Sequence, residues 1–186
     1  MCRTYSTLRP STFSPKPAIL GNNALLLEYA GSMNLPLDET LSRQVAEQIK
    51  SKARQPFENA HKAALVTAGA IYVQGFLIYA SKPYRLVEHS WLEVNGAIVD
   101  PNLPHLKKKA DELIYFPAQR LTVKQLKDAI EEAKEDYPED NPLPIYGSAP
   151  YEYYGDVMLG GKEYLEAYQA AEAKCRELNQ RMVEKN

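Results

Sequence analysis

The chain has 186 residues, of which 45% are hydrophobic and 25% are charged, and this ordinary globular composition excludes wholesale disorder and fibrous repeats. The 22 Lys and Arg residues nearly balance the 24 Asp and Glu residues, which gives a formal net charge of -2. A nucleic-acid partner is therefore not expected, because domains that bind nucleic acid usually carry a marked basic excess. The two cysteines, Cys2 and Cys175, offer neither a disulfide framework nor the ligand spacing of a zinc site.

The N-terminal segment is the first feature in chain order. Residues 1–23 contain three prolines and six Ser or Thr residues without a helical or strand period, which predicts an extended arm. The arm lacks the apolar run of a secretory signal, and no segment of the chain approaches 18 consecutive apolar residues. We therefore expect no membrane span and a cytoplasmic location.

Residues 24–136 are predicted to form an α+β core. Asp38 can cap a helix that runs through residues 41–54. Pro56 suits the first position of a second helix, since that position needs no N–H donor, and Gly69 ends it.

Two extended runs follow this helix. Residues 70–80 are almost continuously apolar, as in a strand that is covered on both faces. Residues 84–94 lead into Asn95-Gly96, the strongest short-range signal of a hairpin, and then into 97–100.

The rest of the chain predicts one more short strand and two helices. The strand lies at 114–116, and Thr122 caps a helix over residues 123–136. Residues 137–186 are predicted to be a Pro/Tyr-rich loop followed by an amphipathic helix, packed on the core.

The register of the hairpin brings chemically useful side chains together. Because side chains alternate along a strand, His89, Trp91 and Asp100 share one face, with His89 opposite Asn102. Asp100 is the diagonal neighbour of His89, at roughly 7–8 Å between Cα atoms, and its carboxylate can orient the imidazole as in a catalytic triad. The simpler interpretation makes His89 a half-buried strand residue and Asp100 a cap for the turn before Pro101. Spacing alone leaves both interpretations open.

The hairpin sequence HSWLEVNGAIVDPN resembles the H-A-W-x-E-V-x-G-x-x-x-D-P-T stretch of transglutaminase-like, papain-related proteins. Three weaker segments occur in the same order: PFENAHKAAL resembles the helix C-[YF]-x-N-A, IYVQGFLIYA the strand Y-V-E-G-Y-A, and IYFPAQRLTVKQL the segment Y-F-G-x-x-F…L. Together they cover residues 54–130. The resemblance implies a papain/transglutaminase-like core, in which a helix packs on an antiparallel sheet, and a Cys–His–Asp set for acyl transfer or amide hydrolysis.

Carried over by residue, the resemblance makes His89 the general base and Asp100 the orienting acid. The nucleophile position falls on Pro56, which has no nucleophilic atom. An active enzyme would need a substitute, and the candidate is Cys2 on the arm; the alternative is that Cys2 is simply exposed. Cys175 on the last helix is expected to be a small packing residue.

Candidate binding residues flank this site. Trp91 and Asn102 are expected to line a cleft that accepts an extended peptide or an amide. Tyr151, Tyr153 and Tyr154 are typical of a rigid aromatic recognition loop, although they are equally typical of a loop that packs onto the core.

Neither a metal nor a cofactor is predicted. His61, His89 and His105 could in principle join Asp100 in a metal site, but no two histidines have the helical i, i+4 spacing of such a site and no HExxH motif occurs.

Three functions follow from the sequence. The first is a catalytically inactive transglutaminase-like domain, a pseudoenzyme, that binds a protein or peptide in a regulatory or inhibitory role. The second is an active acyl-transfer or amide-hydrolysing enzyme that uses Cys2 with His89 and Asp100. The third is a structural or assembly protein, in which the C-terminal amphipathic helix makes a homo-oligomer or partner contact.

Overall fold

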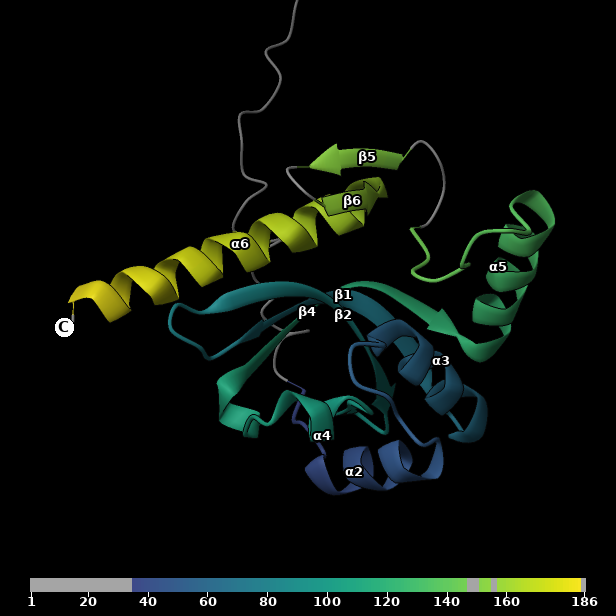
Figure 1. Cartoon of the computed structure of the whole chain (residues 1–186), viewed down its shortest axis with the longest axis horizontal. Coiled ribbons are helices and arrows are strands. Elements are labelled where there is room, and N and C mark those ends of the chain that lie inside the picture. The colour runs from purple at the N-terminus through teal and green to yellow at the C-terminus, as the bar shows by residue number, and fades with distance from the viewer. Residues whose placement is uncertain (1–34, 147–150, 155–156, 185–186) are drawn as a thin grey trace, which may run out of the picture.

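The computed structural model describes residues 35–146, 151–154 and 157–184, with side chains for 35–146 and 160–184 (Figure 1). The helices are α2 (Glu39–Gln48), α3 (Pro56–Val66), α4 (Leu103–Leu106), α5 (Val123–Asp136) and α6 (Gly161–Glu184). The strands are β1 (Ile71–Tyr79), β2 (Arg85–Val94), β3 (Ala97–Val99), β4 (Leu113–Thr122), β5 (Tyr151–Tyr154) and β6 (Val157–Gly160), and a 3-10 turn η1 spans Ala110–Glu112.

Strands β1 to β4 form one antiparallel sheet in the order β3-β2-β1-β4, and β5 and β6 form a separate hairpin. The described part of the chain also contains five α-helices, so the predicted α+β class is confirmed. The predicted N-terminal arm, residues 1–23, lies outside the described residues. None of the described helices is long and apolar enough to cross a membrane.

The predicted helix starts are confirmed by their caps. The Asp38 carboxylate accepts a hydrogen bond from the Leu41 N–H at 2.9 Å, Pro56 is the first residue of α3, and the Thr122 hydroxyl accepts from the Gln125 N–H. Helix α2 ends at Gln48, six residues before the predicted end, because Lys50 adopts a left-handed conformation with φ of 53°.

The predicted hairpin is present in the expected register. Val94 pairs with Ala97 and Glu93 with Ile98, so that Asn95 and Gly96 are the two turn residues, with φ of 50° and 77°. These positive φ values explain why the turn needs Asn and Gly.

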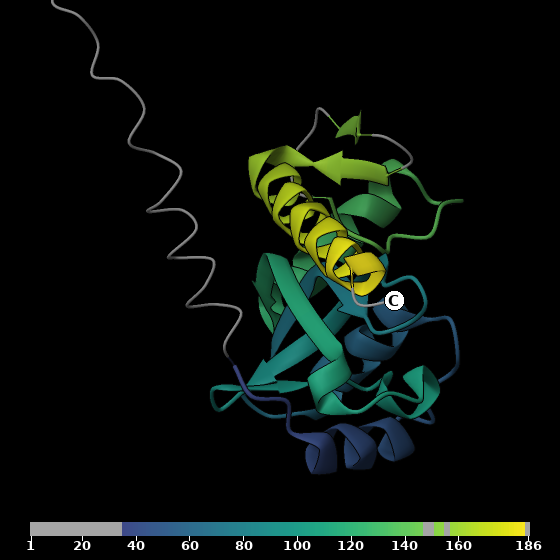
Figure 2. The ribbon, with the colours of Figure 1, turned by 90° about the vertical axis from the view of Figure 1, so that its left-hand side faces the viewer.

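The sheet has two differently covered faces. The helix-covered face carries Tyr72, Phe76 and Leu92, which pack against α3, α5 and α6. The opposite face, here called the α4 face, carries Val73 and Trp91 and packs against residues that include Leu103 of α4. Figures 1 and 2 show α6 running along one side of the sheet, with α4 on the other side and α2 next to it.

The C-terminal part departs in detail from the sequence prediction. The segment interpreted as a Pro/Tyr-rich loop contains β5, which pairs with β6. The apolar side of α6 (Tyr164, Ala167 and Ala171) packs on Phe76 of the sheet. The apolar face of this helix is therefore buried within the chain.

Gly75 lies in the middle of β1 at a bulge, where β4 comes unusually close. A Cβ at residue 75 would lie 2.0 Å from the carbonyl oxygen of Phe116 and 2.8 Å from the Ala118 nitrogen. We expect Gly75→Ala to lower the free energy of unfolding by about 2–3 kcal/mol, because backbone atoms must move apart.

Urea denaturation measures this loss, and Gly69→Ala is the matched control. Gly69 has φ of 69°, but a Cβ at residue 69 would have no atom within 4 Å, so only backbone strain of about 1 kcal/mol is expected. A larger loss for Gly69→Ala than for Gly75→Ala would contradict the close approach of β4.

Candidate functional site

The centre of the candidate site is the pair of His89 on β2 and Asp100, the residue after β3. The His89 Nε2 atom lies 2.8 Å from Asp100 Oδ2, with both side chains buried. These are the diagonal neighbours that the hairpin register predicts. The pair is thus positioned by the two-residue turn and by side-chain alternation, both of which are written in the local sequence.

Asp100 is fully buried and accepts hydrogen bonds from several donors. Its Oδ2 also accepts from the Tyr115 hydroxyl at 3.0 Å, and its Oδ1 accepts from the backbone and side-chain nitrogens of Asn102 at 2.8 and 3.0 Å. Burial raises the pKa of Asp100, but the charge of His89 and the hydrogen bonds from His89 and Asn102 outweigh it and hold the pKa below its usual value. Asp100 is therefore an ionised acceptor, and the proton in its bond with His89 is on Nε2.

A chain of amide side chains connects this pair to the first turn of α3. The Asn102 Nδ2 atom donates to Asp100 and to the Ser90 carbonyl, while its Oδ1 accepts from Asn59 Nδ2 at 2.8 Å. Asn59 is on α3 and also binds both backbone groups of Lys52. Helix α3 and the Asp100 carboxylate are therefore two buried hydrogen bonds apart.

The link runs around the edge of the sheet. Strand β3 pairs with β2 only up to Leu92, so the outer side of Ser90 is available to Asn102. The His89 ring itself lies on the α4 face, stacked at 6.3 Å on Trp91 and at 6.4 Å from Tyr115. The alanines of α3 pack on the opposite, helix-covered face.

The free nitrogen of the His89 ring decides what the pair can do chemically. Since Nε2 is held by Asp100, Nδ1 is the atom that would take a proton from a nucleophile. Across the part of the chain that the structure describes, Nδ1 has no hydrogen-bond partner, and 4% of the His89 side chain remains accessible. The pair has the geometry of an oriented base without a bound nucleophile.

Pro56 is the first residue of α3, a position at which the helix N-terminus would lower the pKa of a cysteine thiol. Its ring has no ionisable or nucleophilic atom. Cys2, the suggested substitute, lies outside the described residues. Cys175 is a free thiol that packs in the same hydrophobic cluster as Phe76 and Tyr164. Burial raises its pKa, as expected of an unreactive packing residue.

Of the predicted binding residues, Trp91 and Asn102 are buried, and the tyrosines are in a separate hairpin. Trp91 is 1% exposed and packs in the hydrophobic cluster of the α4 face, whereas Asn102 is 4% exposed and its side chain serves hydrogen bonding. Tyr151, Tyr153 and Tyr154 are in β5, and their side chains lie outside the described part of the chain.

The other histidines are apart from the pair. His61 is half-buried on α3, where burial and then the nearby charges of Lys134, Lys62 and Lys127 lower its pKa. His105 is on α4, and its Nε2 atom lies 3.0 Å from the Ser51 hydroxyl. In residues 35–146 and the other described segments, no three His, Cys, Asp or Glu side chains gather as metal ligands do.

The sequence missed three residues that complete the site. Tyr115 and Asn59 are described above, and the Ser42 hydroxyl accepts from the Asp100 N–H at 2.9 Å while donating to the Asp38 carbonyl at 2.6 Å. Asn59 was visible as the Asn of PFENA, but no local pattern indicates that Ser42 or Tyr115 would reach Asp100 across the fold.

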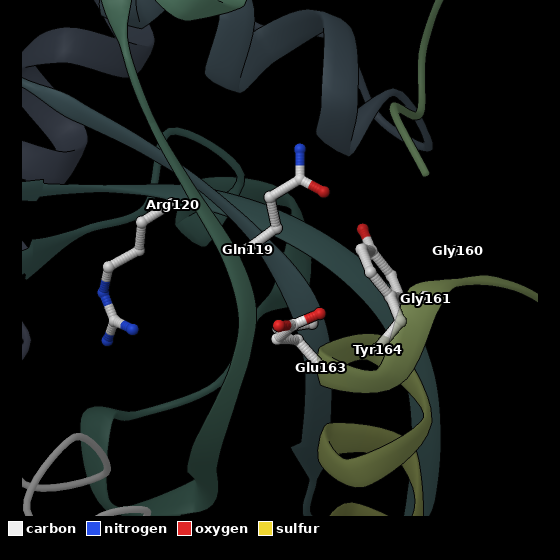
Figure 3. A pocket seen from close by; sticks show the side chains of 7 residues that line it. Gln119, Arg120, Gly160, Gly161, Glu163 and Tyr164 are labelled. Carbon is white, nitrogen blue, oxygen red and sulfur yellow. The ribbon is translucent and has the colours of Figure 1, made fainter. Parts of the chain in front are cut away.

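A pocket of about 400 Å³ lies elsewhere, between β4 and the start of α6. It is lined by Ala118, Gln119, Arg120, Gly160, Gly161, Glu163 and Tyr164. Figure 3 shows the Gln119 amide and the Tyr164 ring on the same side of β4, with the Arg120 side chain directed away. Arg120 forms a two-bond ion pair with Glu93, at 2.9 Å for each bond.

Comparisons of the chain with protein-family models, with curated proteins and with solved structures found no match.

Proposed function

We propose that the chain is a non-catalytic domain with a transglutaminase-like, papain-related arrangement, and that it works by binding an extended protein or peptide segment. The observation that carries the proposal is Pro56 at the tip of α3, at the position where the resemblance expects a cysteine. The same helix is tied through Asn59 and Asn102 to the Asp100–His89 pair. The base and the acid are kept, and the nucleophile position is chemically inert.

The order of elements supports the same arrangement. Helix α3 is followed by β1 and by the β2–β3 hairpin, in a sheet of order β3-β2-β1-β4. This is a helix packed on an antiparallel sheet, as the resemblance implies, with His89 on β2 and Asp100 directly after β3. The His89 ring lies on the face of the sheet opposite to α3, and the link between them runs through Asn102 and Asn59. In such a domain the buried His89–Asp100 pair stabilises the fold and does not take part in catalysis.

Strand β4 is the surface that best suits an extended partner. Among the described strands it pairs only with β1, so its outer edge presents backbone donors and acceptors that a peptide strand can use. Pro117 lacks an N–H, so pairing would begin beyond it. The pocket at Gln119 and Gly161 adjoins this part of β4 and would accept one side chain of the partner.

The test is selection of peptides from a random display library on the immobilised full chain, followed by fluorescence anisotropy with the selected peptide. We expect saturable binding that weakens at least tenfold in Gln119→Trp, which fills the pocket, and is unchanged in Gln180→Trp on the exposed end of α6. Failure of every peptide to bind saturably, or equal binding by both variants, would overturn the assignment of this surface. Cleavage or amide transfer of a bound peptide, seen by mass spectrometry, would overturn the non-catalytic role.

Alkylation of thiols separates this proposal from an enzyme that uses Cys2. Under the proposal, iodoacetamide modifies Cys2 at the rate of an ordinary free thiol, equally in the wild type and in His89→Gln. Peptide mapping by mass spectrometry locates the adduct. Rapid modification of Cys2 that is lost in His89→Gln would favour the enzyme instead.

A further inference from the structure

A second carboxylate, that of the half-buried Glu88, lies on the helix-covered face of β2, away from the His89–Asp100 pair. Its Oε2 atom accepts a hydrogen bond from the Tyr146 hydroxyl at 3.1 Å. Its Oε1 atom is buried and has no hydrogen-bond partner among the described residues. A buried carboxylate oxygen without a donor strongly disfavours the charged form.

The groups that face Glu88 are neutral. They come from β1, α6 and the segment that follows α5, and they are Tyr72, Tyr164 and Tyr146. In the described part of the chain no Lys, Arg or His side chain forms an ion pair with Glu88. Burial raises the pKa of Glu88 to about 7, and the Tyr146 hydrogen bond only partly opposes this.

Tyr146 belongs to the segment of residues 143–146, which lies against this face of the sheet and is held by two hydrogen bonds to the Gln74 side chain. The Gln74 amide donates to the Ile145 carbonyl at 2.8 Å and accepts from the Ile145 N–H at 2.9 Å. The Leu143 side chain is buried in the hydrophobic cluster that contains residues of α3 and α5. The Tyr146 carbonyl also sits against Gly160, where a Cβ would lie 1.5 Å from it, so the segment closes over the start of α6.

We propose that Glu88 is a proton-controlled latch for segment 143–146: the segment stays on the sheet while the carboxyl is protonated, and ionisation of the carboxylate, whose Oε1 atom has no donor among the described residues, favours its release. Release gives the Glu88 charge access to water. It also exposes Gln74, which is buried on the helix-covered face of the sheet. This inference stands independently of the proposed function, because neither Pro56 nor a partner enters it.

The direction and the pH window follow from linkage. The carboxyl binds its proton more tightly in the closed form, with a pKa of about 7, than in a solvated form near the ordinary value of 4.5. The closed form is therefore favoured fully below pH 4.5, opens progressively more often as pH rises from 4.5 to 7, and levels off above 7. If opening exposes the carboxylate fully to water, the equilibrium constant for opening rises by about 10²-fold between pH 4.5 and pH 7.

Hydrogen exchange of the Ile145 amide reports opening directly, since its N–H donates to Gln74. Using the full chain, we expect the protection factor of Ile145, which is corrected for intrinsic exchange, to fall by about 10²-fold between pH 4.5 and pH 7.5. Amides of the β1–β2 ladder near Tyr72 and Leu92 serve as an internal reference and should have higher protection factors than Ile145 at every pH, because local release of the segment does not expose them. In Glu88→Gln the protection factor should be independent of pH, because the variant keeps an acceptor for Tyr146 and removes the charge.

Three results would overturn the latch. One is a pH-independent protection factor for Ile145 in the wild type, and another is the same pH dependence in Glu88→Gln. The third is a protection factor for Ile145 equal to that of the reference amides at every pH, which would mean that Ile145 exchanges only through global unfolding. If Glu88→Gln does not fold, ¹³C NMR titration of the Glu88 carboxyl in the wild type decides the matter, and an ordinary pKa near 4.5 would exclude a latch.

Discussion

Asp100→Ala is expected to lower the free energy of unfolding by about 3–5 kcal/mol, the largest single loss that the structure predicts. The carboxylate is fully buried and receives hydrogen bonds from His89, Tyr115 and Asn102. Removing it leaves these donors without an acceptor in the interior. Because the folded-state pKa of Asp100 is lowered, its contribution is present at neutral pH and is lost as pH falls below about 4.

Urea denaturation at pH 7 measures the effect, with Asp128→Ala as the matched control. Asp128 is exposed on α5, so its replacement should change stability by less than about 0.5 kcal/mol. Similar stabilities for the two variants would show that the buried network around Asp100 does not hold the fold together.

Glu88→Gln is expected to act in the opposite direction and to stabilise the protein at high pH. The folded-state pKa of Glu88 is raised to about 7 from 4.5, so its ionisation opposes folding above pH 7 and has no effect below about pH 4.5. We expect the variant to gain about 2–3 kcal/mol of unfolding free energy at pH 8 and almost nothing of this kind at pH 4.

The comparison is made by urea denaturation of the wild type and the variant at both pH values. Glu132→Gln, on the exposed side of α5, is the control and should show no pH-dependent gain. If Glu88→Gln is less stable than the wild type at pH 8, the carboxylate must have a compensating partner when it is ionised.

Local sequence patterns predicted the elements whose causes are local. The caps Asp38 and Thr122, the helix start at Pro56 and the Asn95-Gly96 turn each act within a few residues, and the structure has all of them. The missed elements depend on pairing between neighbouring segments, which the pattern of one segment alone does not show. Strand β5 exists through its pairing with β6, and the early end of α2 accompanies the turn that brings Lys52 onto Asn59.

The same distinction holds for the candidate site. Period-2 alternation and the two-residue turn were sufficient to place His89 beside Asp100. Tyr115, Ser42 and Asn59 reach Asp100 or Asn102 from β4, α2 and α3, so their roles depend on tertiary packing. The burial of Trp91 has the same origin, since Leu103 of α4 and Tyr115 of β4 pack in the same cluster.

The most direct test of the proposed function is the ionisation of a thiol placed at residue 56. Under the proposal, the tip of α3 is the vacated nucleophile position of the His89–Asp100 pair. We therefore expect the Pro56→Cys thiol to titrate clearly below about 8.5, the usual value for a free cysteine, and to titrate nearer 8.5 when His89→Gln is added. The pH dependence of its alkylation measures the pKa in both backgrounds. A thiol that titrates near 8.5 in both, or whose pKa does not respond to His89, would contradict the proposal.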